Sequence, residues 1–242
     1  TAVGPLLVVV NPPSFDGDIA KWFYNFPLAG IDVPTATVGL IEPGIGDQLA
    51  AGSNHTFQQG LDNFRASAGI TTAGSYYTVA NNGLNFIIGN SSERSLDVGV
   101  VTSANPNSTM GLYGGSGFGN NAQANAYTAY QAAFWDPINA PPVVTSSFGI
   151  FQQASPNSPF ARAVRELFVD GALANITTFL ANNDWGSSYN FGNGIANQNA
   201  ALSSPYAVLV GGTSLTTLAS APLDSTVAST PSPAGSLYGL AM

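Results

Sequence analysis

Short apolar runs of strand type alternate with amphipathic stretches of helix type along this chain. β-Branched runs bounded by turn residues predict strands at Ala36–Ile41, Val98–Thr102, Val143–Ser147, Ile176–Leu180 and Ala207–Val210. Apolar residues at helical spacing predict helices at Phe57–Ala68, Ala122–Phe134 and Pro159–Ala174. The last helix is the best marked, since Ser158 can cap it and Pro159 suits its first position. This alternation predicts an α/β fold with a mainly parallel sheet and helices on both faces.

Polar, small-residue clusters follow three of these predicted strands. They are Ser147-Phe148-Gly149, Asn182-Asn183-Asp184-Trp185-Gly186 and Gly211-Gly212-Thr213-Ser214. Binding sites in open α/β sheets gather at the carboxyl ends of the strands. We therefore expect the functional site at this edge of the sheet.

Length and composition predict one large domain over residues 1–242, whose Ser/Thr/Pro/Ala-rich end at 219–242 is expected to be an irregular tail. With 242 residues and 45% hydrophobic content, the chain can bury a substantial core. No apolar run reaches the roughly 18 residues that a membrane-spanning helix needs.

The charge balance and the missing residue types narrow the chemistry. Five basic residues face thirteen acidic ones, a net charge of -8, which argues against binding to nucleic acids or anionic membranes. The absence of cysteine excludes a thiol nucleophile, a disulfide framework and a zinc-thiolate site. His55 is the sole histidine, so a histidine metal cluster is excluded too, and we expect His55 not to be catalytic. Carboxyl and hydroxyl groups therefore remain as the candidates for catalytic chemistry.

Glu93 and Asp97 form a noteworthy pair because charged residues make up only 7% of the chain. Positions four apart share a helix face, where two ionised carboxylates repel by about 0.2–0.5 kcal/mol. Sharing a proton relieves the repulsion and raises one pKa, which suits a general base working in acid. The alternative is a solvated helix edge beside Arg94.

The order of these motifs resembles the sedolisins, the serine-carboxyl peptidases, which have a subtilisin-like fold and act in acid. Glu93-Arg-Ser-Leu-Asp97 is similar to their Glu-to-Asp helix motif, and Ser147-Phe148-Gly149 to their Ser-aromatic-Gly strand end. Asn182 to Gly186 echoes their Ser-Gly-Asp-Ser-Gly loop, while Ser204-Pro205-Tyr206 and Val210-Gly211-Gly212-Thr213 match a later strand closely. The resemblance covers roughly Phe26 to Leu215.

The resemblance implies a mechanism and site residues. A serine hydroxyl attacks the peptide carbonyl while Glu93 takes its proton as general base and Asp97 holds and tunes Glu93. Asp184, kept protonated, would donate a hydrogen bond to the oxyanion, which confines activity to acid. Backbone groups of Ser147, Phe148 and Gly149 would bind the extended substrate.

The sequence departs from the family at two places. Asn183 and Trp185 stand on either side of Asp184, where the family has small residues. These larger side chains put in doubt whether Asp184 is placed to donate a hydrogen bond to the oxyanion. Ser214 lacks the family's following Pro, so it is a poor candidate for the nucleophile. The expected Gly-Thr-Ser motif, its helix and the family's calcium loop do not follow. Without that helix an apolar sheet face would stay uncovered. We therefore expect a two-chain enzyme whose carboxyl-terminal fragment or subunit supplies the serine and the calcium site.

Two other function classes stay open. A catalytically inactive sedolisin-like binding or structural module would explain the missing serine, and the intact Glu93 and Asp97 pair counts against it. An acidic surface protein fits the composition but leaves the motif order unexplained. For the enzyme, we expect peptide or protein substrates, no metal site on this chain, and a secreted location in an acidic environment.

Overall fold

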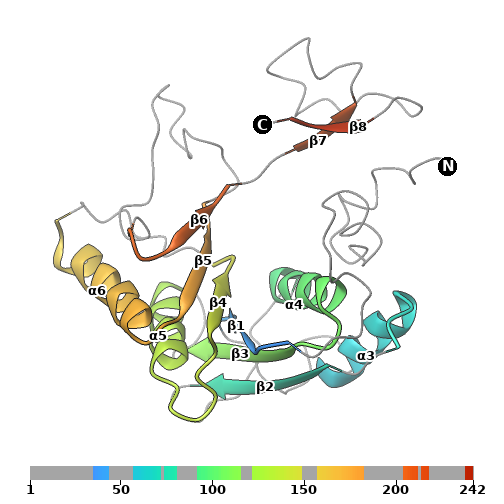
Figure 1. The fold of residues 1–242 in the computed structure, drawn as a ribbon, viewed down its shortest axis with the longest axis horizontal. Coiled ribbons are helices and arrows are strands. Elements are labelled where there is room, and N and C mark those ends of the chain that lie inside the picture. Colours follow the sequence, from blue (N-terminus) through green and yellow to red (C-terminus); the bar gives the residue numbers. More distant parts are fainter. Residues whose placement is uncertain are drawn as a thin grey trace.

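A parallel six-stranded sheet with helices on both faces forms the body of the computed structural model (Figure 1). The structure describes residues 35–43, 57–71, 74–80, 92–115, 122–148, 157–182, 204–211, 214–217 and 238–241. The strands of this sheet are β1 (Val38–Ile41), β2 (Ser75–Ala80), β3 (Thr109–Gly115), β4 (Val143–Ser146), β5 (Thr177–Ala181) and β6 (Val208–Val210). The helices are α3 (Phe57–Ser67), α4 (Ser92–Ala104), α5 (Ala122–Phe134) and α6 (Pro159–Leu173). The strands lie in the order β2-β3-β1-β4-β5-β6, so β1 and β4 are neighbours at the centre of the sheet.

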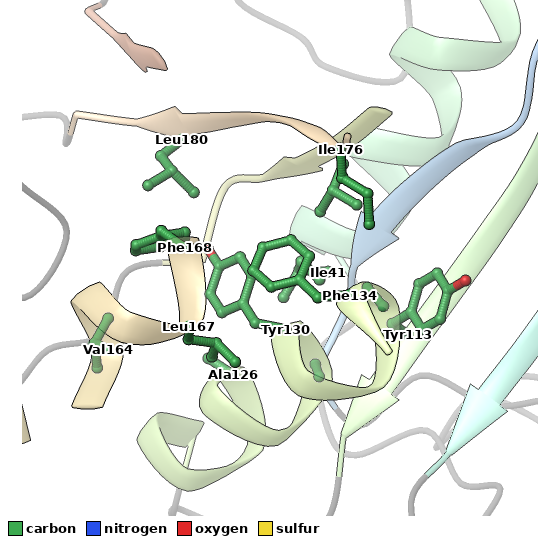
Figure 2. Close-up of a cluster of buried hydrophobic side chains, with 13 residues drawn as sticks. Ile41, Tyr113, Ala126, Tyr130, Phe134, Val164, Leu167, Phe168, Ile176 and Leu180 are labelled. Carbon is green, nitrogen blue, oxygen red and sulfur yellow. The ribbon is translucent and has the colours of Figure 1, made fainter. Parts of the chain in front are cut away.

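Alternating side chains along the strands divide the core into two layers. Leu40 and Leu112 point to one face, where they meet Leu61 of α3 and Val98 of α4. The next residue along each strand points to the other face and packs against α5 and α6. Figure 2 shows that second layer, with Tyr130, Phe134 and Phe168 at its centre. We call the two sides the α3/α4 face and the α5/α6 face.

Helix α4 crosses the sheet with the opposite hand to the other three described helices. The chain moves one way along the sheet from β1 to β2 and back from β2 to β3, yet α3 and α4 lie on the same face. The later connections through α5 and α6 run in the direction of α4 but on the other face. Because nearly all such crossovers are right-handed, α4 is the left-handed exception.

Most of the predicted elements are confirmed, and α6 is confirmed in detail. The Ser158 hydroxyl accepts the hydrogen bond of the Ala161 amide at 3.2 Å, and Pro159 occupies the first turn. At the other end Asn175 has φ 61°, and the amides of Asn175 and Ile176 donate to the carbonyls of Ala172 and Gly171. This pair of hydrogen bonds is a Schellman motif, which turns the chain directly into β5.

The predicted strand at Val98–Thr102 is wrong, because these residues form the second half of α4. A short apolar run does not distinguish a buried strand from a buried helix. Packing decides the outcome here: Val98 is 3% exposed among sheet residues, and Gly99 lies where a Cβ atom would be 3.4 Å from the Phe64 ring of α3.

Strands β2 and β3 were not predicted. Three glycines interrupt β3, and Gly111 shows why: a Cβ atom there would lie 2.4 Å from the Tyr77 hydroxyl of β2. A separate two-stranded antiparallel sheet pairs β7 (Ser214–Thr217) with β8 (Tyr238–Ala241). Strand β8 lies within the stretch 219–242 that the sequence predicts as an irregular tail, and residues 218–237 lie outside the described residues.

Candidate functional site

A hydrogen bond between Ser147 and Asp97 joins two of the predicted motifs. The Ser147 hydroxyl donates to Oδ1 of Asp97 at 2.8 Å, across fifty positions of sequence. Ser147 directly follows β4, so the contact lies at the carboxyl end of the sheet, where sites in open α/β folds gather. Asp97 is half-buried and Ser147 is exposed. This contact defines the candidate site.

The turn after β4 directs the Ser147 side chain toward α4. Ser146 is buried on the α5/α6 face, so by strand alternation the next side chain points to the α3/α4 face. The Ser146 hydroxyl accepts from the Phe148 amide at 3.1 Å and is 3.2 Å from the Phe148 carbonyl oxygen. This local hydrogen bonding holds the backbone of the segment predicted to bind substrate.

Core packing holds Asp97 in place from the other side. Its neighbour Val98 is buried against Leu40, Met110 and Leu112 of the sheet. Further along α4, the Thr102 hydroxyl contacts the Met110 sulfur at 3.7 Å. The carboxylate therefore projects from a helix whose second half packs on the sheet.

The structure brings some of the predicted site residues together and leaves others outside its description. Glu93 lies in α4 one turn before Asp97, on the same helix, and its side chain is outside the described residues. Gly149, Asp184 and His55 also lie outside the described residues. Ser214 begins β7, opposite Ala241, in the separate two-stranded sheet.

Glu42 is an acidic residue at this site that the sequence analysis did not single out. It follows β1 directly, is 0% exposed, and its amide donates to the Tyr113 carbonyl at 2.9 Å. Extending the β1–β4 register places Glu42 level with Ser147, and strand alternation places both on the α3/α4 face. An acid that ends an apolar strand just before Pro43 is the sequence signal that could have found it.

Part of the α3/α4 face beside the site is exposed. Thr145 of β4 is level with Phe179 of β5, which is level with Val208 of β6. Val208 is 47% exposed and Val210, further along β6, is 49% exposed. The opposite side of the same strands is buried under α6. A sheet that is packed on one face thus keeps apolar side chains in solvent on the other.

A second polar cluster lies on the α5/α6 face. The Tyr113 hydroxyl donates to Oδ2 of Asp136 at 2.9 Å and is 3.1 Å from the Tyr77 hydroxyl. Burial is the main cause that raises the pKa of Tyr113 and of Tyr77. The hydrogen bonds of Tyr113 raise its pKa further, whereas the hydrogen bond with Tyr113 acts to lower the pKa of Tyr77. Burial also acts to raise the pKa of Asp136, but hydrogen bonds from Asn139, the Ile138 amide and Tyr113 outweigh it, so that pKa lies below its ordinary value.

Neither a metal cluster nor a membrane-spanning helix occurs in the described part of the chain. No group of three or more His, Cys, Asp or Glu side chains among those residues could hold a metal ion. The helices there are too short or too polar to cross a bilayer.

Comparison with known proteins gives a structural match. No protein-family model and no curated protein sequence matches the chain. A solved structure of Pseudomonas sedolisin, a serine-carboxyl proteinase complexed with two molecules of pseudo-iodotyrostatin, matches 86% of the chain with a TM-score of 0.61. The fold is sedolisin-like. Identity is 21%, and the chain spans about half of that protein, 55% of its length. The predicted α/β, subtilisin-like architecture is thereby confirmed.

Proposed function

We propose that this chain is the amino-terminal portion of an acid-active serine-carboxyl endopeptidase domain that hydrolyses peptide bonds. The observation that carries the proposal is the Ser147–Asp97 hydrogen bond. It unites the acidic-pair helix with the predicted substrate-binding segment at the sheet edge where α/β enzymes place their sites. The sedolisin-like fold supports the same reading of the motifs.

In the proposed reaction, a serine hydroxyl forms a bond to the carbonyl carbon of the scissile peptide. Glu93 takes the hydroxyl proton and later returns it to the leaving amine, while Asp97 keeps Glu93 oriented and shares its charge. Asp184, protonated, donates a hydrogen bond to the oxyanion. Water then cleaves the acyl-enzyme and restores the serine. The backbone of Ser147, Phe148 and Gly149 holds the substrate extended.

The serine is proposed to come from a carboxyl-terminal fragment or subunit, which also carries the calcium site. The chain spans 55% of the length of the sedolisin that it matches. One observation on the sheet supports a covering partner. The exposed Val208 and Val210 lie on the same sheet face as Asp97 and Ser147, where a covering element could dock beside the site.

A hydrolysis assay on the native complex tests the proposed function. We expect peptide cleavage at about pH 4, near the ordinary pKa of a carboxyl group, and its loss at neutral pH. Glu93→Gln should lower kcat by about 10²–10⁴-fold, the usual contribution of a general base. The matched control is Glu166→Gln, which changes an exposed acid of α6 and should leave kcat unchanged. Undiminished cleavage by the Glu93→Gln complex would refute the assigned base.

Mass spectrometry of the same preparation tests the partner. After labelling in acid with a serine-directed inhibitor, the adduct should lie on a second polypeptide. An adduct on Ser214 would instead place the nucleophile on this chain.

The enzyme is proposed to act outside the cell in an acidic environment.

The second candidate is a catalytically inactive sedolisin-like binding or structural module. The altered residues around Asp184 favour it, because Trp185 stands where the family has a small residue. Such a module would form no adduct and would cleave no peptide at any pH.

A further inference from the structure

The Ser147 side chain contacts Asp97, whereas the backbone of the same residue belongs to the segment proposed to bind substrate. Its hydroxyl donates to Asp97 at 2.8 Å, and this is a contact between two elements whose positions are set independently. Helix α4 is held by Val98 in the α3/α4 core, and the turn after β4 is held by the Ser146 hydroxyl on the Phe148 amide. The hydrogen bond therefore links a rigid helix to a rigid turn.

A hydroxyl donor at this position favours the ionised form of the Asp97 carboxyl. It also restricts the rotation of that carboxyl, since Oδ1 is held toward β4. The charged residues on the elements around this contact are Glu93 and Arg94 on α4, Glu42 after β1, and Asp62 and Arg65 on α3.

We propose that Ser147 is a positioning residue, whose hydroxyl holds Oδ1 of Asp97 and so orients that carboxyl for its contact with Glu93. The role in catalysis rests on the proposed function, but the effect on Asp97 does not. The substrate-binding segment and the acidic pair would thus be coupled through one side chain. A substrate that pulls the 147–149 backbone toward itself would act directly on the group that orients the base.

Carbon-13 NMR titration of the aspartate carboxyls in the full chain tests the effect without needing peptidase activity. Asp97→Asn assigns the resonance. We expect Ser147→Ala to raise the pKa of Asp97, because a donor to the charged form is lost, and Ser147→Thr to restore it. The matched control is Ser75→Ala, which removes another exposed hydroxyl contact, 3.0 Å from the Thr109 hydroxyl on β2 and β3. It should leave the Asp97 titration unchanged.

Two further readouts separate positioning from a structural role. The melting temperature should be nearly the same for Ser147→Ala and Ser75→Ala, since exposed hydrogen bonds contribute little to stability. In the active complex, Ser147→Ala should lower kcat by roughly tenfold with KM little changed, the equivalent of one hydrogen bond. An Asp97 titration that is identical in Ser147→Ala and the wild type overturns the inference, whether or not the complex cleaves peptides. A complex without peptidase activity but with a shifted Asp97 titration overturns the proposed function alone.

Discussion

Asp136 anchors the turn after α5, and replacing it should cost stability in a pH-dependent way. Its carboxylate accepts four hydrogen bonds between 2.8 and 3.0 Å: from the Tyr113 hydroxyl, the Asn139 side chain and the amides of Ile138 and Asn139. In Asp136→Ala the exposed turn donors find water. The Tyr113 hydroxyl belongs to a fully buried residue and keeps only Tyr77.

The magnitude follows from those four bonds. A hydrogen bond to a charged group contributes about 1.5–3 kcal/mol, and the Tyr113 bond is the one that water does not replace. The three turn bonds are accessible to solvent and together add about 0.5–1 kcal/mol. We expect Asp136→Ala to lower the free energy of unfolding by about 2–4 kcal/mol at neutral pH.

The pH dependence has a definite sign. Because folding lowers the pKa of Asp136, the ionised carboxylate stabilises the fold above the unfolded pKa, about 3.9. This contribution is lost as the pH falls through the lower folded value. The difference between wild type and Asp136→Ala should therefore be constant from neutral pH to about pH 5 and shrink below about pH 4.

Urea denaturation at a series of pH values measures this difference. Asp170→Ala, which changes an acid of α6 outside the cluster, controls for the general effect of removing a negative charge. A wild-type-to-alanine difference that is the same at pH 7 and in strong acid would refute the reasoning, as would a difference below about 0.5 kcal/mol at pH 7, within the range of an ordinary surface substitution.

Two further predictions concern the exposed sheet face and the end of α6. Val208→Lys should leave the stability of the chain within about 0.5 kcal/mol but weaken assembly of the proposed two-chain complex, measured by size-exclusion chromatography and peptide hydrolysis. Leu173→Lys, at a residue that is 81% exposed on α6, is the control, and equal assembly of both variants would remove the β6 face as the docking surface. Asn175→Val should cost about 1–2 kcal/mol in urea denaturation because φ at this position is 61°, whereas Asn175→Gly should not; equal stabilities would show that the left-handed geometry is not retained in solution.

Local patterns predicted those elements whose packing agrees with their propensity. Helix α6 is an example, because its cap, its proline and its apolar spacing all indicate the same element. The Val98–Thr102 run failed because the α3/α4 core accepts it as a helix, and no local signal contains that information. Strand β3 was missed because one of its glycines, Gly111, leaves room for Tyr77 of another strand, which no local pattern reveals.

The candidate site could be predicted only as far as local motifs show it. The acidic pair and the Ser147 segment were visible as motifs, and the structure adds that Asp97 and Ser147 touch. Glu42 ends an apolar strand, which was a usable signal, but its complete burial and its level beside Ser147 became evident only with the sheet register.

The unusual hand of the α4 crossover has a consequence for how the protein reaches its native state. A β2-α4-β3 unit on its own favours the right-handed arrangement, which would put the Glu93 and Asp97 helix on the wrong side of the sheet. Leu40 of β1 and Leu61 of α3 form the layer that receives Val98, so we expect β1 and α3 to be in place before α4 takes the rarer hand. Docking of α4 is thus expected late in folding. In a misassembled chain Asp97 would not reach Ser147, so the candidate site forms only when the central sheet is complete.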